Sequence, residues 1–224
     1  MASTAGARFF TVVAMCLLAA PTASAQEAPF AANGLFVGAT GVPNFTLDGI
    51  TFDGSSYYQQ IGGDEVLILP KLEPTSTVRG FVGYRLTRGS FEVGYERTNH
   101  VGSFVGIPTN ATFSALNFDE RIYALTHGRI QPYGLLGLSL PRLTVKNGSV
   151  LDDQLGDASF HGFGLNIEPG VAVFVHPHVG ISAGYRYRVM WFDTAEGVSH
   201  TTYELRPRFR ETAGTVSFSA FVTF

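Results

Sequence analysis

The sequence has little charge, a single cysteine and no strong excess of either sign of charge. Charged residues make up 15% of the 224 positions, against roughly 25% in soluble domains, which argues against an ordinary cytosolic protein. The 45% of hydrophobic residues and the 26 glycines exclude an intrinsically disordered chain, because disorder requires little apolar surface and high net charge. A formal charge of −3 provides no cationic field for a polyphosphate backbone, so nucleic acid is excluded as a partner.

The only cysteine, Cys16, lies in an apolar run near the N-terminus. An arginine precedes this run and a small-residue motif follows it, which is the three-part layout of a secretory signal peptide. The run is shorter than the about 20 residues of a membrane-spanning helix. We therefore expect cleavage of residues 1–25, with Ala23 and Ala25 at the cleavage site. Residues 26–224 are then expected to form one domain without cysteine.

No later stretch approaches 18 consecutive apolar residues, which excludes a helical membrane protein. Several segments instead alternate between apolar and small or polar residues with a period of two, as β-strands do. The clearest strands are predicted at 77–86, 91–97, 180–191 and 215–224. Less regular strands are predicted at 34–44, 113–126, 132–140 and 158–175, which brings the count to eight.

Two residues do not fit this alternation. Glu120 falls on the apolar side of its strand unless a bulge shifts the register. Pro169 lies inside a strand, where it removes one ladder hydrogen bond, so a bulge or a break is expected there.

The connections between the predicted strands alternate strictly in length. Short turns are expected at 87–90, 127–131 and 176–179, and long polar loops at 45–76, 98–112, 141–157 and 192–212. Outer-membrane barrels have short periplasmic turns and long external loops. The pattern therefore predicts an all-β fold, a closed eight-stranded antiparallel up-and-down transmembrane β-barrel.

Residue types indicate which face of this barrel is outside. One face of the strands is rich in Leu, Val, Phe, Tyr and Trp, which suits contact with lipid. The other face carries Gly, Ser and a few charged residues, and the interior of an eight-stranded barrel is just wide enough for side chains to fill. The register places nine charged residues in the lumen: Arg79, Arg85, Glu92, Glu96, Asp119, Arg121, Glu168, Arg186 and Arg188.

The five positive and four negative lumen charges nearly cancel. Because a paired charge is tolerable in a low-dielectric interior and an unpaired charge is costly, a salt-bridge network that fills the barrel is expected. The alternative is a narrow water-filled channel with the same charges solvated.

The whole predicted mature chain resembles the small OmpA/OmpX-type outer-membrane β-barrels. The resemblance rests on eight alternating strands, the segments PYGLLGLSL and GYRYR, and a terminal Phe224 after alternating apolar residues. It implies a location in the cell outer membrane, contact with its lipid and lipopolysaccharide, and periplasmic chaperones and the barrel assembly machinery as partners. The assembly signal would then comprise Phe218, Ala220, Val222 and Phe224. An OmpA-like peptidoglycan-binding domain is not expected after the barrel.

Catalytic and metal-binding groups are sparse. His161 and Ser159 share one face of a strand whereas Glu168 faces the other, which is poor geometry for a triad. His176 and His178 lie in a short turn, where two ligands alone make a weak metal site. No catalytic residue, metal or cofactor is expected.

The first long loop is unusually apolar, with Tyr57, Tyr58 and the segment VLIL at 66–69. It could form a surface for an extracellular ligand, or a hairpin extension that packs on the barrel mouth. The expected role is therefore non-enzymatic: membrane integrity, with loops available for adhesion or recognition. The alternatives are a small pore or transporter of small or apolar solutes and, less favoured, a lipid A-modifying enzyme.

Overall fold

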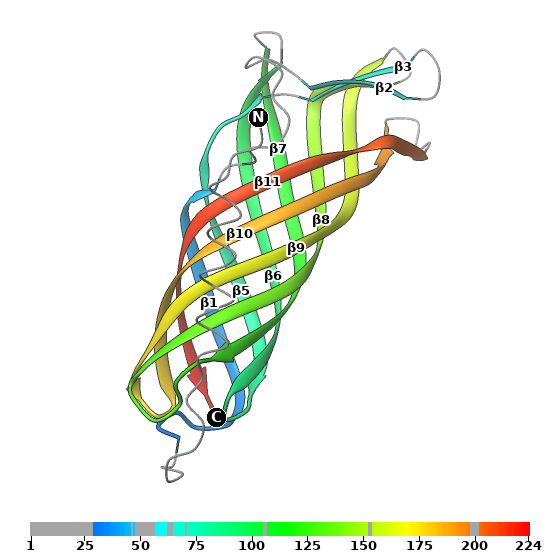
Figure 1. Ribbon diagram of the computed structural model, residues 1–224. Helices are drawn as coiled ribbons and strands as arrows, with labels where there is room; N and C mark the ends of the chain where they lie inside the picture. The colour runs from blue at the N-terminus through cyan, green and yellow to red at the C-terminus, as the bar shows by residue number, and fades with distance from the viewer. Residues whose placement is uncertain are drawn as a thin grey trace, which may run out of the picture.

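The computed structural model describes residues 29–45, 47, 57–61, 65–69, 71–104, 107–151, 154–197 and 202–224. The predicted signal peptide, with Ala23 and Ala25, lies outside this part of the chain. Eight long strands form a barrel (Figure 1): β1 (Gly34–Phe45), β5 (Thr75–Arg85), β6 (Gly89–Phe104), β7 (Ile107–Tyr123), β8 (Ile130–Leu151), β9 (Gln154–His176), β10 (Val179–Glu196) and β11 (Thr202–Thr223). Three short strands precede β5: β2 (Tyr57–Ile61), β3 (Glu65–Leu69) and β4 (Lys71–Leu72). The described residues contain no helix that is long and apolar enough to cross a membrane.

The barrel closes through its first strand. Each long strand pairs antiparallel with its neighbours in the chain, and β1 pairs with both β5 and β11. The closing ladder runs from Phe36 opposite Thr223 to Gly41 opposite Phe218. The predicted closed, eight-stranded antiparallel architecture is confirmed.

Most strands are longer than the sequence predicted. Residues 98–104, 107–112, 141–151 and 154–157 continue the ladders of β6 to β9, where long loops were expected. Inward positions there stay filled, by Leu143 and Val145 on β8 and by Thr98 and His100 on β6, while most outward positions become polar. The apolar outer face therefore ends before the strands do.

The first long connection contains a short hairpin. Strand β2 pairs with β3, and the pair lies beside β8 and β11 at the end of the barrel where the strands are prolonged (Figure 1). We call this the extended end. Of the two possibilities left open by the sequence, a hairpin extension at the barrel mouth is present.

The two irregular residues behave differently from each other. The register of β7 is continuous through Glu120, which pairs with Phe91 and Leu136 and lies exposed on the outer face. At Pro169 a bulge or a break was expected, and a break occurs on one side only, since the residue pairs in register with Gly134 of β8. The ladder from β9 to β10 is interrupted there and resumes in the same register, because proline has no N–H to donate.

The residues before β1 tie the three short turns together. The Phe30 amide donates to the Thr126 carbonyl at 3.0 Å, and the Ala32 amide donates to the Pro177 carbonyl at 2.9 Å. The Asn33 side-chain amide donates to the Thr87 hydroxyl at 3.2 Å. These turns define the turn end of the barrel, opposite the extended end that carries β2 and β3.

Candidate functional site in the barrel interior

All nine charged residues assigned to the lumen by the alternation are buried, at 1–5% exposure. The strand period explains this orientation, because every second residue of a closed sheet points inward. They form a charged layer in the middle of the barrel, and their partners come from different strands.

One chain of ion pairs joins β5, β7, β10 and β9. The Arg79 guanidinium lies 2.7 Å from the Asp119 carboxylate, and Arg186 lies 3.6 Å from the same carboxylate. Arg186 also donates to Glu168 at 2.7 Å, and Glu168 accepts a hydrogen bond from Tyr133 at 2.6 Å. Asp119 therefore bridges two arginines on strands that are not neighbours.

Two further pairs and two buried amides complete the layer. Arg121 lies 3.1 Å from Glu92, and Arg188 pairs with Glu96 across the lumen. The Asn166 side chain accepts from Arg188 at 2.8 Å and donates to Asp119 at 3.1 Å. Its neighbour Asn117 accepts from Asn166 at 3.2 Å. The layer is thus a connected network of ion pairs, in which Asn166, Asn117 and Tyr133 add hydrogen bonds to several of the charged groups.

Glycines on the inner face provide the space for this layer. A Cβ atom at Gly94 would overlap the guanidinium of Arg79, and one at Gly137 would overlap the carboxylate of Asp119. Gly80, on the outer face of the neighbouring strand, has nothing within 4 Å of the equivalent position. Large charged side chains and glycines thus alternate inside the barrel.

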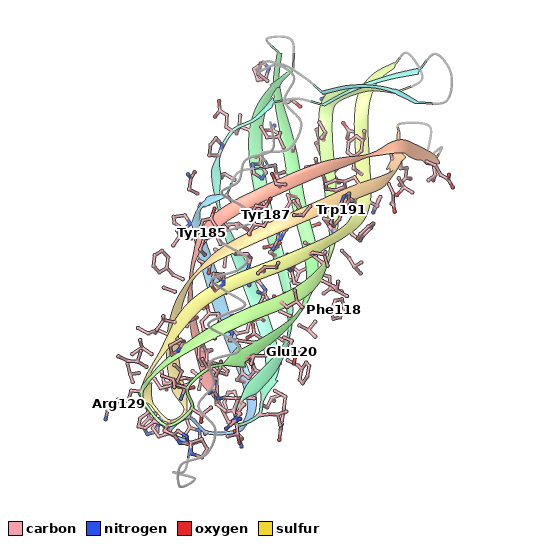
Figure 2. All side chains as sticks on the ribbon, in the orientation of Figure 1. Phe118, Glu120, Arg129, Tyr185, Tyr187 and Trp191 are labelled. Atoms are coloured by element: carbon pink, nitrogen blue, oxygen red, sulfur yellow. The ribbon has the colours of Figure 1, made fainter. Side chains whose placement is uncertain are left out.

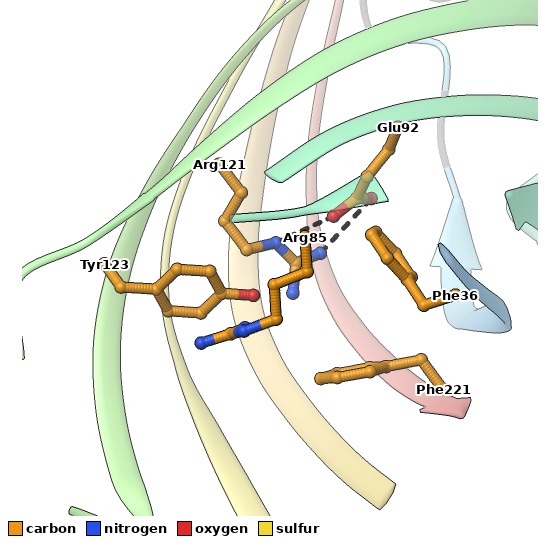
Figure 3. A pocket seen from close by; sticks show the side chains of 6 residues that line it. All are labelled: Phe36, Arg85, Glu92, Arg121, Tyr123 and Phe221. Atoms are coloured by element: carbon orange, nitrogen blue, oxygen red, sulfur yellow. Dashed lines mark hydrogen bonds and ion pairs between the residues drawn. The ribbon is translucent and has the colours of Figure 1, made fainter. Parts of the chain in front are cut away.

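Arg85 is the fifth arginine, and no carboxylate pairs with it among the described residues. Its guanidinium lies 3.9 Å from the ring centre of Tyr123 and 4.6 Å from that of Phe174, and it donates to Gln131 at 2.6 Å. Figure 3 shows Arg85 among Phe36, Tyr123 and Phe221, with the ion pair of Arg121 and Glu92 beside it. Aromatic faces stabilise a desolvated cation here in place of an anion.

Apolar layers lie on both sides of the charged layer, one toward each end of the barrel. The turn end is filled by Ala31, Phe36, Phe81, Tyr123, Tyr133, Leu135, Ala172, Phe174 and Phe221. The extended end is filled by a second cluster that includes Val42, Phe45, Phe113, Leu143, Val145, Phe160, Met190 and Phe192.

The cavities next to the charged layer are very small. The one bounded by Val42, Phe45, Arg79 and Arg188 leaves about 10 Å³ for water, enough for about one molecule. The one beside Arg85 has no room for water. The described interior is therefore packed with side chains.

Sequence reasoning did not find the neutral members of this interior. Asn117, Asn166, Gln131 and Tyr133 all satisfy charged groups, and each lies at an inward position of its strand. A search of the alternation for polar residues of every kind, and not for charges alone, would have found Asn117, Asn166 and Tyr133, whereas Gln131 falls in a segment expected to be a turn.

The other candidate residues form no catalytic or metal centre. His161 is partly exposed on the outer face, Ser159 shares a hydrogen bond of 3.1 Å with Thr144, and Glu168 is buried in the lumen. The rings of His176 and His178 lie 5.6 Å apart at a tilt of 30°, and the His178 ring contacts the Thr223 carbonyl at 2.9 Å. No group of three or more metal-ligating side chains gathers in the part of the chain that the structure describes.

The residues of the expected assembly signal lie on one face of the last strand. Phe218, Ala220 and Val222 are exposed on the outside of β11, and Phe224 is 70% exposed. The Phe224 amide donates to the Leu35 carbonyl at 2.7 Å, which joins this end to the start of β1.

A closed barrel with an apolar outer wall and a polar inner layer matches a known family. A sequence model of the outer membrane protein beta-barrel domain matches residues 10–210. The chain belongs to this family. The outer-membrane barrel therefore spans the bacterial outer membrane, and the turn end and the extended end are its periplasmic and external ends.

Solved structures share this fold. Neisserial surface protein A is 21% identical, with a TM-score of 0.54, and the match covers 85% of this chain and 97% of that one. The outer membrane protein OprG from Pseudomonas aeruginosa is 15% identical, with a TM-score of 0.51 and coverage of 90% and 100%. No curated protein sequence matches this outer-membrane barrel.

Proposed function

We propose that this barrel is a non-conducting, non-enzymatic protein of the outer membrane that supports membrane integrity and presents its external end for adhesion or recognition. The observation that carries the proposal is the packed lumen. A connected layer of ion pairs lies between two apolar layers, and the adjoining cavities hold at most about one water molecule. A transported solute would need a path that these side chains occupy.

The external end supports the second part of the proposal. The ladders of β8 and β9 continue to residues 151 and 154, well beyond the apolar outer face, and β2 and β3 add a hairpin beside them. A surface held by continuous strand pairing is pre-ordered, which lowers the entropic cost of binding an extracellular ligand.

Conductance separates this function from the pore alternative. The mature protein is refolded in detergent, its folded band is verified by its shift on heating in a gel, and it is inserted into planar bilayers. We expect no reproducible conductance steps. Steady steps would contradict the packed lumen and favour a small pore.

A deletion strain of the native host tests the two proposed roles separately. We expect the strain to become sensitive to detergents, and the wild-type gene to restore resistance. A variant shortened at the tip of β8 and β9 should restore resistance without restoring surface binding.

Lipid A analysis of the same strains checks the enzymatic alternative. A change of acylation that depends on the gene would contradict the non-enzymatic proposal.

A further inference from the structure

Glu120 is a charged residue on the lipid-facing wall of the barrel. Its strand neighbours on this face are Phe118 and Ile122, and its cross-strand partners are Phe91 and Leu136. Figure 2 shows Glu120 and Phe118 on the same side of the barrel wall. A carboxylate thus lies among aromatic and aliphatic side chains.

Glu120 is close to the periplasmic end of the barrel. It precedes Tyr123, the last residue of β7, by three positions, which is about 10 Å along a strand. The carboxylate therefore lies within reach of the headgroups of the periplasmic leaflet. No ion pair joins it to another side chain among the described residues. Ionisable residues in the membrane zone generally pair with an oppositely charged group or with backbone carbonyls.

The wall around Glu120 is hollowed into a groove of about 610 Å³. Its apolar lining includes Val82, Tyr84, Phe91, Phe118, Leu136 and Leu138. Glu92 and Asp119 also border the groove, but their side chains are buried in the lumen. Glu120 is therefore the charged side chain that the groove presents to lipid.

We propose that this groove binds a phospholipid with a primary ammonium headgroup, whose acyl chain lies along the apolar lining while the ammonium pairs with Glu120. The groove favours a hydrocarbon chain, because a chain that fills it makes van der Waals contacts along the apolar lining. The carboxylate repels anionic headgroups, whereas a primary ammonium donates charge-assisted hydrogen bonds. The site thus selects phosphatidylethanolamine over phosphatidylglycerol.

The experiment uses the refolded protein in nanodiscs that contain equal amounts of these two lipids with identical acyl chains. Native mass spectrometry counts the lipids that remain bound. We expect the wild-type protein to retain about two- to fivefold more phosphatidylethanolamine, the range of a partly screened ion pair. Glu120→Gln should abolish the preference, because the amide keeps the shape and loses the charge.

Two further variants keep the result interpretable. Glu73→Gln removes an exposed carboxylate outside the groove and should retain the preference. Val82→Trp fills the groove and should reduce the retention of both lipids while Glu120 is intact. Equal retention by the wild-type protein, or a preference that survives Glu120→Gln, would overturn the proposal. So would efficient crosslinking of two copies through Glu120→Cys, because a second barrel would then cover the groove.

Discussion

Each ion in the lumen depends on a residue that is distant in sequence. Asp119 meets Arg79 and Arg186, and Arg186 also meets Glu168. Removal of one member leaves a buried charge without its partner, and this costs more than the pair itself contributes to stability.

Arg186→Leu is therefore expected to lower the free energy of unfolding by about 3–5 kcal/mol, because Glu168 and Asp119 both lose a cation in a buried site. Equilibrium denaturant unfolding of the refolded protein in lipid measures this change. Lys146→Gln, at an exposed position of β8, provides the control and should unfold at the wild-type midpoint. Unchanged denaturant resistance of Arg186→Leu would argue against a stabilising network.

The inner glycines lead to a second test. Gly94→Ala is expected to cost about 1–3 kcal/mol, because the added methyl group overlaps Arg79 and forces the ion layer to shift. Gly80→Ala adds the same atom in open space and should change stability by about 0.5 kcal/mol or less. The same denaturant assay compares the two variants, and equal effects would contradict the packing argument.

The orientation of the charged residues could be predicted from the sequence, but most of their partners could not. A period of two determines which face a side chain occupies, and all nine charges are buried in the lumen. Pairing across the lumen depends on barrel closure and stagger, which the alternation does not specify. Arg85, held between Tyr123 and Phe174, depends on that three-dimensional arrangement.

Among the elements, the ends of the strands were the hardest to predict. The sequence limited each strand to the stretch with an apolar outer face, whereas strand pairing requires only an inner face that packs. Val145, which is buried and pairs with Ala158, extends β8 past its predicted end at residue 140. Pro169 was expected to cause a bulge or a break, and it breaks one ladder only, since its missing N–H faces β10.

The last strand allows assembly to be separated from stability. Phe224 is 70% exposed, and its hydrogen bond to Leu35 uses backbone atoms. Phe224→Ala is therefore expected to leave the free energy of unfolding within about 0.5 kcal/mol of wild type, yet to reduce the amount of folded barrel in the outer membrane of living cells several-fold. Fractionation of membranes and the heat-shift gel measure this amount.

Phe221 provides the matched contrast, because its ring is buried against Phe36 and Phe174. Phe221→Ala should lower the free energy of unfolding by about 3–5 kcal/mol. Normal assembly of Phe224→Ala would contradict the proposed signal.

The whole molecule consists of a membrane-spanning barrel and an external extension of the same sheet. The apolar cluster at the external end reaches Val145 and Ala158, and among the described residues of β8 and β9 no member of the core clusters lies beyond this pair. Replacement of residues 148–155 by Asn-Gly is expected to change the free energy of unfolding by about 1 kcal/mol or less, since the closing loop remains short.

Phe160→Ala, inside the cluster, should lower the free energy of unfolding by about 3–5 kcal/mol and serves as the comparison. Heat-shift gels and denaturant midpoints measure both variants. A large loss on trimming alone would mean that the extension stabilises the membrane-spanning part.

The cross-lumen ion pairs also constrain the order of folding. Glu96 and Arg188 are 92 positions apart, on β6 and β10, which are not neighbouring strands. If the strands entered the bilayer one after another, β6 would carry Glu96 into hydrocarbon before its partner Arg188 of β10 arrived, at a high free-energy cost. We therefore expect the strands to gather and close around their charges as the sheet enters the membrane, so that the two halves of the chain meet before insertion is complete.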